Sequence, residues 1–322
     1  MATSTWTSVL ENFTAETLLN DSFELKQAET TTTVPEALEL LTKHRLQCLP
    51  VWDNAAGMYV GLVDVLDILA LVTVASDCKG IVDVASHGSA TWEAFWAQEN
   101  EVIRTFPIAE LCNISERNPW VPVDIATPLV DVLSMFGRGS GLKRVPVIDG
   151  EGFMRGFITQ SAIIAWLSTS LALLNSDILS KKMHECEQLG STDVRTVSTD
   201  GTALDAYRNM IQDKLSALAV VSPAGALVGC ISGSDLKGSE GVGLFSDLSK
   251  PVAEYLAASS ERFQRPDSLH PITVSPDSSV GDLLTQIHAH RVHRVFLVDP
   301  ATSAPLKLIS LTDIITFLEN QH

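Results

Sequence analysis

Two segments of this chain place a hydroxyl three residues before a carboxylate, where an apolar run passes into a helical pattern. Ser232 precedes Asp235, and Ser310 precedes Asp313 within LISLTDII. An ionised carboxylate only accepts hydrogen bonds, so it suits a ligand with adjacent hydroxyl donors. The start of a helix also attracts anions such as phosphate. The same spacing forms a capping box, in which both side chains bond the first turn of a helix, so each pair predicts a helix start that could also bind a ligand.

Two further segments have the same apolar setting with altered residues. Asp67 follows Asp64, so a carboxylate stands where the other segments have a hydroxyl. Thr159 is followed by Ala162, whose methyl group accepts no hydrogen bond. Like charges repel, so we expect the Asp64 segment to bind phosphate weakly or with a changed preference. We expect the Ala162 segment to be empty.

Basic residues stand upstream of all four segments, in a chain with 22 Lys and Arg against 39 Asp and Glu. A phosphate site in an acidic protein needs local cations, and arginine offers a two-pronged hydrogen-bonding group. A solvated surface loop is the alternative for each residue taken alone. The basic residues are Lys43, His44, Arg45, Lys143, Arg144, Lys214, Arg291, His293 and Arg294.

Charge and composition narrow the classes of function. The net charge of −17 argues against nucleic acid and against anionic membrane surfaces as partners. Five scattered cysteines without a C-x-x-C pair favour a reducing compartment, and the first residues carry no secretory signal pattern. HAHRVH supplies His288, His290 and His293, but no Cys or acid completes a metal-ligand set. With no nucleophile motif or P-loop either, we expect neither a metal site nor an enzyme.

One pattern, repeated four times, positions these residues. An amphipathic helix with i, i+3, i+4 apolar spacing precedes an apolar strand, a turn, a second strand and an apolar helix. The parts from first strand to last helix cover residues 44–72, 142–167, 214–238 and 290–318. The pattern predicts an α/β (α+β) fold of four units, each of about 60 residues and marginally stable alone. We place them at residues 20–75, 105–172, 178–240 and 247–322, with an insertion at 76–104 that contains the helix-like segment TWEAFWAQE.

One uncharged stretch, from Gly156 to Ser176, is long enough to cross a bilayer. The repeated pattern instead divides this stretch into a strand and a helix. We therefore expect no membrane span.

Four such units in tandem resemble the cystathionine-β-synthase (CBS) domain family, arranged as two Bateman pairs, over roughly residues 20 to 322. The segments that carry the resemblance are LPVWD, KRVPVID, LSALAVV, VHRVFLVD and ISLTDI. Within the family the chain is most similar to the γ regulatory subunits of AMP-activated, SNF1-type protein kinases. Those subunits also lack the repeat-two carboxylate that Ala162 replaces here. The resemblance implies a pseudo-symmetric disk.

The resemblance also implies a ligand, AMP, ADP or ATP, and no covalent cofactor. In that family the Asp accepts hydrogen bonds from both ribose hydroxyls, the Ser or Thr faces phosphate, and basic residues before the strand hold phosphate. Residues at the start of the repeat-three strand line an adenine pocket. The residues so implied here are Asp313, Ser310, Asp235, Ser232, Asp67, His293, Arg294, Lys143, Arg144, Arg45, Ser216, Ala217 and Thr196.

By the same resemblance, the partners are a catalytic kinase subunit and a scaffolding β subunit, and the location is cytoplasmic or nuclear. Two alternatives stay open at this point. One is an interaction scaffold with degenerate pockets, which Asp64 and Ala162 favour. The other is a sensor of another adenosyl ligand such as S-adenosylmethionine, which the basic residues disfavour.

Overall fold

The computed structural model describes most of the 322-residue chain. The described residues are 10, 12–19, 23–44, 46–78, 105–137, 140, 142–169, 176–236, 247–263 and 269–320. Two expectations lie outside them: the role of Arg45, and the helix at TWEAFWAQE within the insertion.

Each repeat folds around a three-stranded sheet, in which a short first strand runs parallel to the second and the last two form an antiparallel hairpin. Apolar runs become the hairpin strands because their side chains are buried between the sheet and the helices that follow. The described strands form four such sheets: β1 (Ala28–Glu29), β2 (Cys48–Asp53) and β3 (Met58–Asp64); β4 (Val123–Asp124), β5 (Arg144–Ile148) and β6 (Met154–Thr159); β7 (Thr196–Ser198), β8 (Ala217–Val221) and β9 (Leu227–Ser232); β10 (Thr273–Val274), β11 (Arg294–Val298) and β12 (Pro305–Ser310).

An aspartate turns the chain between the hairpin strands in three of the repeats. The Oδ1 atom of Asp53 accepts hydrogen bonds from the backbone amides of Ala55 and Ala56. Asp149 and Asp299 accept equivalent backbone bonds in repeats two and four. An Asp that bonds its own loop backbone favours a turn, so the turn position expected from the sequence is confirmed.

Helices begin where the sequence predicts them, before the first hairpin strand and after the second. The helices are α2 (Val34–Lys43), α3 (Val65–Cys78), α5 (Leu129–Ser134), α6 (Gln160–Thr169), α7 (Ser176–Ser180), α8 (Ala203–Gln212), α10 (Val252–Phe263), α11 (Val280–His290) and α12 (Leu311–Glu319). Repeat three differs, because only the 3-10 turn η6 (Gly233–Leu236) follows β9 within the described residues. Helices in the described ranges are too short or too polar to cross a bilayer, and β6 and α6 divide the apolar stretch as expected.

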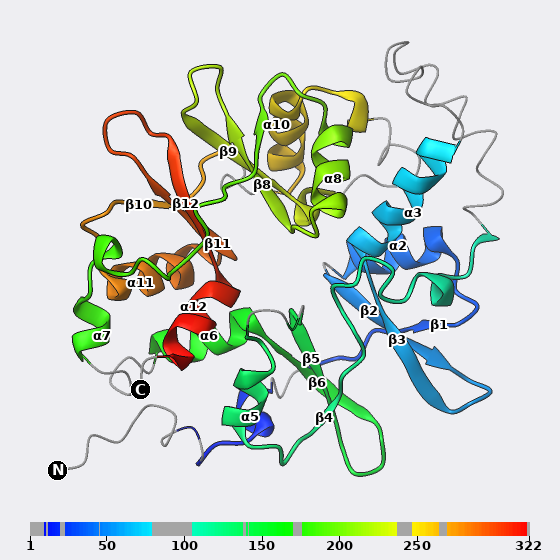
Figure 1. The fold of residues 1–322 in the computed structure, drawn as a ribbon. Helices are drawn as coiled ribbons and strands as arrows, with labels where there is room; N and C mark the ends of the chain where they lie inside the picture. Colours follow the sequence, from blue (N-terminus) through cyan, green and yellow to red (C-terminus); the bar gives the residue numbers. More distant parts are fainter. Residues whose placement is uncertain are drawn as a thin grey trace.

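The four repeats form a ring, in the order one, three, four, two (Figure 1). One apolar core joins the helices of repeats one and three, and a second joins those of repeats two and four. The sheets meet at the other two junctions: Tyr59 stacks on Trp120 between repeats one and two, and Leu227 donates its amide to Ser303 between repeats three and four. The expected disk of two paired modules is confirmed.

The connecting segments pack on helix starts rather than on the repeat that follows them. The 3-10 turn η3 (Ile108–Leu111) joins the core of repeats one and three, and Ile108 donates its amide to Thr32, just before α2. Similarly, α10 packs on α8 and β9. Residues 247–263, which we expected in repeat four, therefore pack with repeat three, because α10 buries its apolar face on that repeat's helix.

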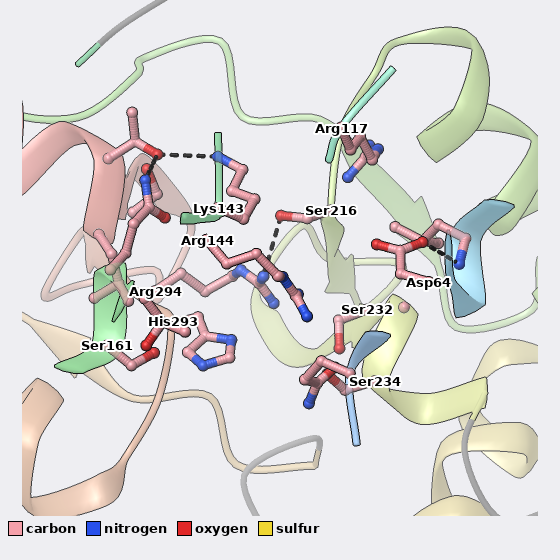
Figure 2. A pocket seen from close by; sticks show the side chains of 18 of the residues that line it. Asp64, Arg117, Lys143, Arg144, Ser161, Ser216, Ser232, Ser234, His293 and Arg294 are labelled. Atoms are coloured by element: carbon pink, nitrogen blue, oxygen red, sulfur yellow. Dashed lines mark hydrogen bonds between the residues drawn. The ribbon is translucent and has the colours of Figure 1, made fainter. Parts of the chain in front are cut away.

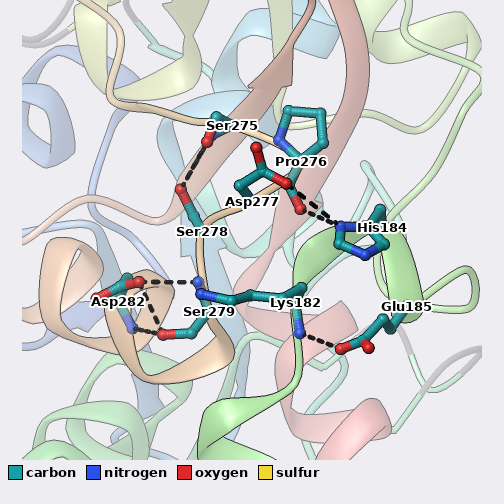
Figure 3. Close-up of polar contacts among 9 residues, drawn as sticks. All are labelled: Lys182, His184, Glu185, Ser275, Pro276, Asp277, Ser278, Ser279 and Asp282. Carbon is teal, nitrogen blue, oxygen red and sulfur yellow. Dashed lines mark hydrogen bonds and ion pairs between the residues drawn. The ribbon is translucent and has the colours of Figure 1, made fainter.

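Figure 3 shows another such junction, where residues 181–185 lie along the start of α11. The Met183 amide donates to the Ser278 carbonyl, and the His184 amide and ring nitrogen both contact the Pro276 carbonyl. Nearby, Gly190 has a φ of +87°, and a side chain there would lie 2.8 Å from the Leu308 carbonyl oxygen. This backbone conformation and close approach require glycine.

Candidate functional site

A cavity of about 280 Å³ lies at the centre of the ring, and residues of all four repeats line it. Its volume is close to the roughly 300 Å³ lower limit typical of small-molecule pockets. The lining residues are Gln47, Asp64, Val65, Leu66, Arg117, Lys143, Arg144, Thr159, Gln160, Ser161, Ser216, Ser232, Gly233, Ser234, His293, Arg294, Ser310, Leu311 and Thr312. Most come from the starts of the first hairpin strands or from the helix starts that follow the hairpins.

Strand register explains why these positions converge. The first residue of each hairpin pairs with the last, so the strand start and the following helix start always lie together: Arg144 pairs with Thr159, and Arg294 with Ser310. Backbone bonds tie the two places more closely, as where the Leu311 amide donates to the His293 carbonyl. Because all four hairpins point these ends at the ring centre, equivalent positions of each repeat supply most of the cavity wall.

The register-equivalent residues differ sharply between repeats. Repeats two and four supply the cationic pairs Lys143–Arg144 and His293–Arg294. In repeats one and three the same two positions hold uncharged residues. These are Gln47 and Cys48, and Ser216 and Ala217.

Basic residues precede the first hairpin strand of every repeat, as expected, but Lys43 and Lys214 do not line the cavity. Lys214 lies upstream of the cavity wall and makes an ion pair with Glu116, and both side chains are two-thirds exposed. Lys43 is exposed at the end of α2. Spacing along the chain had grouped these residues with Lys143, but a strand register distinguishes positions one residue apart.

Two of the basic residues, Lys143 and Arg294, hydrogen-bond hydroxyl groups of other repeats. Lys143 Nζ lies 3.0 Å from the Thr312 hydroxyl, which also accepts a hydrogen bond from Gln160. Arg294 donates to the Ser216 hydroxyl at 3.2 Å, so it crosses from repeat four to repeat three. These partners are neutral, which leaves positive charge to be balanced in the cavity.

Burial disfavours the charged forms of two basic residues at the cavity. The pKa of Lys143 is lowered to about 8, first by burial and then by the Arg117 and Arg294 guanidinium groups. Burial lowers the pKa of Arg117 as well, although Asp64 and Asp67 oppose that effect. A site that holds desolvated cations together is one that an anionic ligand would stabilise.

The hydroxyl–carboxylate pairs form capping boxes in the structure. Asp313 Oδ2 accepts hydrogen bonds from the Ser310 amide at 2.9 Å and the Ser310 hydroxyl at 2.6 Å. Asp235 Oδ2 accepts the same two bonds from Ser232, at 2.8 and 2.7 Å. The hydroxyls of both serines, but neither carboxylate-bearing residue, belong to the cavity wall. The cap is therefore present, and the ribose contact stays a prediction.

Repeat one builds its cap from two carboxylates. Asp67 Oδ2 accepts from the Asp64 amide, Asp67 Oδ1 accepts from the Ser115 amide, and Asp64 Oδ1 accepts from the Asp67 amide. Asp67 has no exposed surface. Burial and the Asp64 charge raise the pKa of Asp67 to about 7. In repeat two, Ala162 leaves half a box, in which its amide donates to the Thr159 hydroxyl at 3.1 Å.

The structure brings together most, but not all, of the residues predicted from sequence. The cavity wall includes Lys143, Arg144, His293, Arg294, Ser216, Ser232 and Ser310. Ala217 is buried one residue behind Ser216, and Thr196 is exposed on β7, paired with Ala219 and outside the wall. Figure 2 shows Lys143, His293 and Arg294 on one side of the pocket, Asp64 and Arg117 on the other, and Arg144 between them.

Sequence reasoning missed Arg117 and underrated Gln160. Arg117 is 8% exposed and donates to the Met210 carbonyl across repeats, at 3.4 Å. It lies in a connecting segment, where the repeat pattern has no equivalent position. Gln160 is 6% exposed at the start of α6, and a long polar side chain just ahead of the apolar run of that helix was the available signal.

Comparisons with known proteins agree with the four repeats. The CBS domain family model matches residues 25–73, 111–169, 186–239 and 267–320. Protein SDS23 of Kluyveromyces lactis is 22% identical over 88% of this chain, which spans 58% of that protein's length. The 5'-AMP-activated protein kinase subunit gamma of Saccharomyces cerevisiae is 20% identical over 96% of this chain and 91% of its own length.

Among solved structures, protein MJ1225 of Methanocaldococcus jannaschii, described as a candidate archaeal homolog of g-AMPK, has a TM-score of 0.69. It covers 94% of this chain and 99% of its own, at 15% identity. A likeness at this identity shows a shared fold.

Proposed function

The chain belongs to the CBS domain family, and we propose that it is a non-enzymatic, γ-type sensor of adenine nucleotides that regulates a protein kinase. The observation that carries the proposal is the central cavity, where an acidic chain gathers Arg117, Lys143, Arg144, His293 and Arg294. Phosphate groups are the ligands that such a cluster of basic side chains suits best.

Regulation follows from differential affinity. The cavity is shared by four repeats, so a bound ligand contacts both halves of the ring at once. Exchange of AMP for ADP or ATP changes those contacts, and it shifts any partner equilibrium that depends on the relative position of the repeats. By the similarity to the yeast gamma subunit, the partners are a catalytic kinase subunit and a scaffolding β subunit, in the cytoplasm or nucleus.

Calorimetric titration with AMP, ADP, ATP and S-adenosylmethionine tests the proposal. We expect the wild type to bind the three nucleotides, and Lys143→Gln to weaken binding roughly tenfold, the value of one charge-assisted hydrogen bond. Arg155→Gln is the matched control, because Arg155 is 60% exposed and pairs with Asp149 away from the cavity. A wild type that binds none of the nucleotides would overturn the proposal, and binding of S-adenosylmethionine alone would favour the other adenosyl sensor.

The ribose clamp at Asp313 needs its own test, since Asp313 also caps α12. Titration of AMP and 2'-deoxy-AMP into wild type and Asp313→Ala forms a double cycle. A clamp predicts that loss of the 2'-hydroxyl weakens binding to wild type and leaves the variant's affinity unchanged. An equal effect of the deoxy substitution on both proteins would exclude the clamp. The same cycle applies to Asp235→Ala.

One observation favours an interaction scaffold for repeat one alone. Asp67 is fully buried, and both its oxygens accept backbone hydrogen bonds. A nucleotide bound at repeat one through Asp67 would have to displace them. A stoichiometry that includes repeat one would contradict this reading.

A further inference from the structure

Asp64 is the only acid among the residues that line the central cavity, all of which lie in the described part of the chain. The register-equivalent positions in the other repeats hold the hydroxyl residues Thr159, Ser232 and Ser310. Repeat one therefore places a carboxylate on a wall whose other residues are uncharged or basic.

Hydrogen bonds hold this carboxylate in place. Asp64 is 8% exposed, and its Oδ1 accepts from the amides of Leu66 at 2.8 Å and Asp67 at 3.1 Å. Its Oδ2 accepts from the Asn118 side-chain amide at 2.6 Å. Asn118 is fixed in turn, because its backbone amide donates to Asn113 at 2.7 Å. The negative charge is thus part of the rigid wall and cannot swing away from an arriving anion.

The charge faces two of the cavity's cations. Asp64 and Asp67 raise the pKa of Arg117 against the effect of its burial. Burial also acts on Arg144, but the Cys48 thiol and the charges of Asp64 and Asp67 outweigh it and leave the pKa of Arg144 raised. In contrast, Lys143 and Arg294 hydrogen-bond the neutral groups Thr312 and Ser216. The acid that acts on Lys143 is Asp313, which lies outside the cavity wall.

The cavity is therefore electrostatically divided, as Figure 2 shows: Asp64 and Arg117 lie on one side, and Lys143, His293 and Arg294 lie on the other. A first phosphate has Lys143 and Arg294 available on the second side, where no acid lines the wall. Further phosphates must extend toward Arg117 and Arg144, whose charge Asp64 already balances, and there they meet its repulsion.

We propose that Asp64 is a built-in counter-anion that limits the phosphate charge the cavity accepts and makes it prefer a nucleoside monophosphate over a triphosphate. This rests on the proposed function, in which the ligand is an adenine nucleotide. Selectivity of this kind arises from an unfavourable contact with the competitor rather than from an extra contact with the favoured ligand.

Asp64→Asn tests the proposal with little change of shape. An asparagine oxygen can still accept from the Leu66 and Asp67 amides. The Asn118 amide can turn so that its oxygen, which is buried without a hydrogen-bond partner, accepts from the new side chain. The matched control is Asp282→Asn, which removes the same charge from an exposed capping box at the start of α11, outside the cavity wall.

The measured quantity is the ratio of dissociation constants for ATP and AMP. We expect wild type to bind AMP more tightly, and Asp64→Asn to tighten ATP binding roughly tenfold while AMP changes by less than about threefold. Asp64→Ser, which copies repeats three and four, should act in the same direction and provides a second variant if the first fails to fold. An unchanged ratio in a folded variant overturns the proposal, as does an equal change in Asp282→Asn.

Inorganic tripolyphosphate separates this inference from the proposed function. It carries the charge without the adenosine, so Asp64→Asn should bind it more tightly than wild type does. If adenine nucleotides fail to bind but tripolyphosphate shows this gain, the nucleotide function is wrong and the role of Asp64 stands. If AMP binds to wild type and neither ATP nor tripolyphosphate responds to Asp64→Asn, the function stands and the counter-anion is wrong.

Discussion

The half of the ring that contains repeats two and four differs from the half that contains repeats one and three in the charge it places on the cavity wall. The first half places Lys143, Arg144, His293 and Arg294 there. At the equivalent positions of the second half, Gln47 and Ser216 line the wall, Cys48 and Ala217 are buried outside it, and Asp64 joins the wall from the facing helix start. Both halves have the same sheets and comparable apolar cores.

The comparison shows that charge at the cavity is set independently of the fold. The residues that differ lie at the strand starts, outside the apolar faces that each half buries. A repeat can therefore lose a cation or gain an acid there at small cost to its core. In the proposed function, the first half attracts an anion and the second limits how much anionic charge enters.

The largest expected effect is on AMP affinity, and it comes from replacing a basic residue of repeats two and four by its equivalent in repeats one and three. Arg294→Ala copies Ala217, its register equivalent, and removes the guanidinium that spans from repeat four to Ser216. We expect AMP binding to weaken roughly hundredfold, or about 2.7 kcal/mol, the loss of two charge-assisted hydrogen bonds. Calorimetry measures it, with Arg155→Ala as the charge-matched surface control. An effect under about threefold would mean that the two halves contribute equally to anion binding.

The next largest effect is on the pH dependence of the free energy of unfolding, and it tests the Asp64–Asp67 pair of repeat one. The pKa of Asp67 is about 7 in the folded chain, against about 3.9 when unfolded. Between those values the folded state binds the extra proton. The free energy of unfolding therefore falls as pH rises, by at most about 1.4 kcal/mol per pH unit, and this contribution is lost as pH passes 7.

Urea denaturation between pH 5 and 8 measures this slope. Asp67→Asn should flatten it whatever its effect on absolute stability, and Asp282→Asn should leave it unchanged, because the pKa of Asp282 is lowered and it titrates below this range. Equal slopes in wild type and Asp67→Asn would show that the pKa of Asp67 is not raised in the folded chain.

The smallest effect concerns the incomplete cap of repeat two. Ala162→Asp should complete the box that Thr159 begins, as Asp313 completes it in repeat four, and stabilise the chain by about 0.5 kcal/mol. Thermal denaturation gives the change. Ser168→Asp adds the same charge at the other end of α6, where the helix dipole opposes it, and should destabilise. Destabilisation by both substitutions would show that repeat two cannot adopt the cap of its partner.

Much of the fold could be predicted because its signals are local. The i, i+3, i+4 spacing located α2 and α11, and an Asp located each of three hairpin turns. The packing of α10 on repeat three could not be predicted, because an amphipathic face shows that a helix is buried and does not show on what. The same applies to η3 and its contact with Thr32.

Site residues could be predicted from the sequence where a basic residue stands directly beside the start of an apolar strand. The basic residues beside the apolar strands include Lys143 and His293, which line the cavity, and Lys214, whose offset of a few residues takes it to the surface. Arg117 was missed, since a connecting segment carries no repeat pattern. The sequence showed Asp64 as a local obstacle to phosphate at repeat one, and the shared cavity gives it influence over the ligands of the other repeats.

A crystal structure of the chain with AMP tests the central claim most directly. The account predicts one nucleotide whose phosphate lies within hydrogen-bond distance of Lys143, His293 or Arg294, on the side of the cavity away from Asp64. A phosphate bound beside Asp64 and Arg117, or a nucleotide bound outside the central cavity, would contradict it.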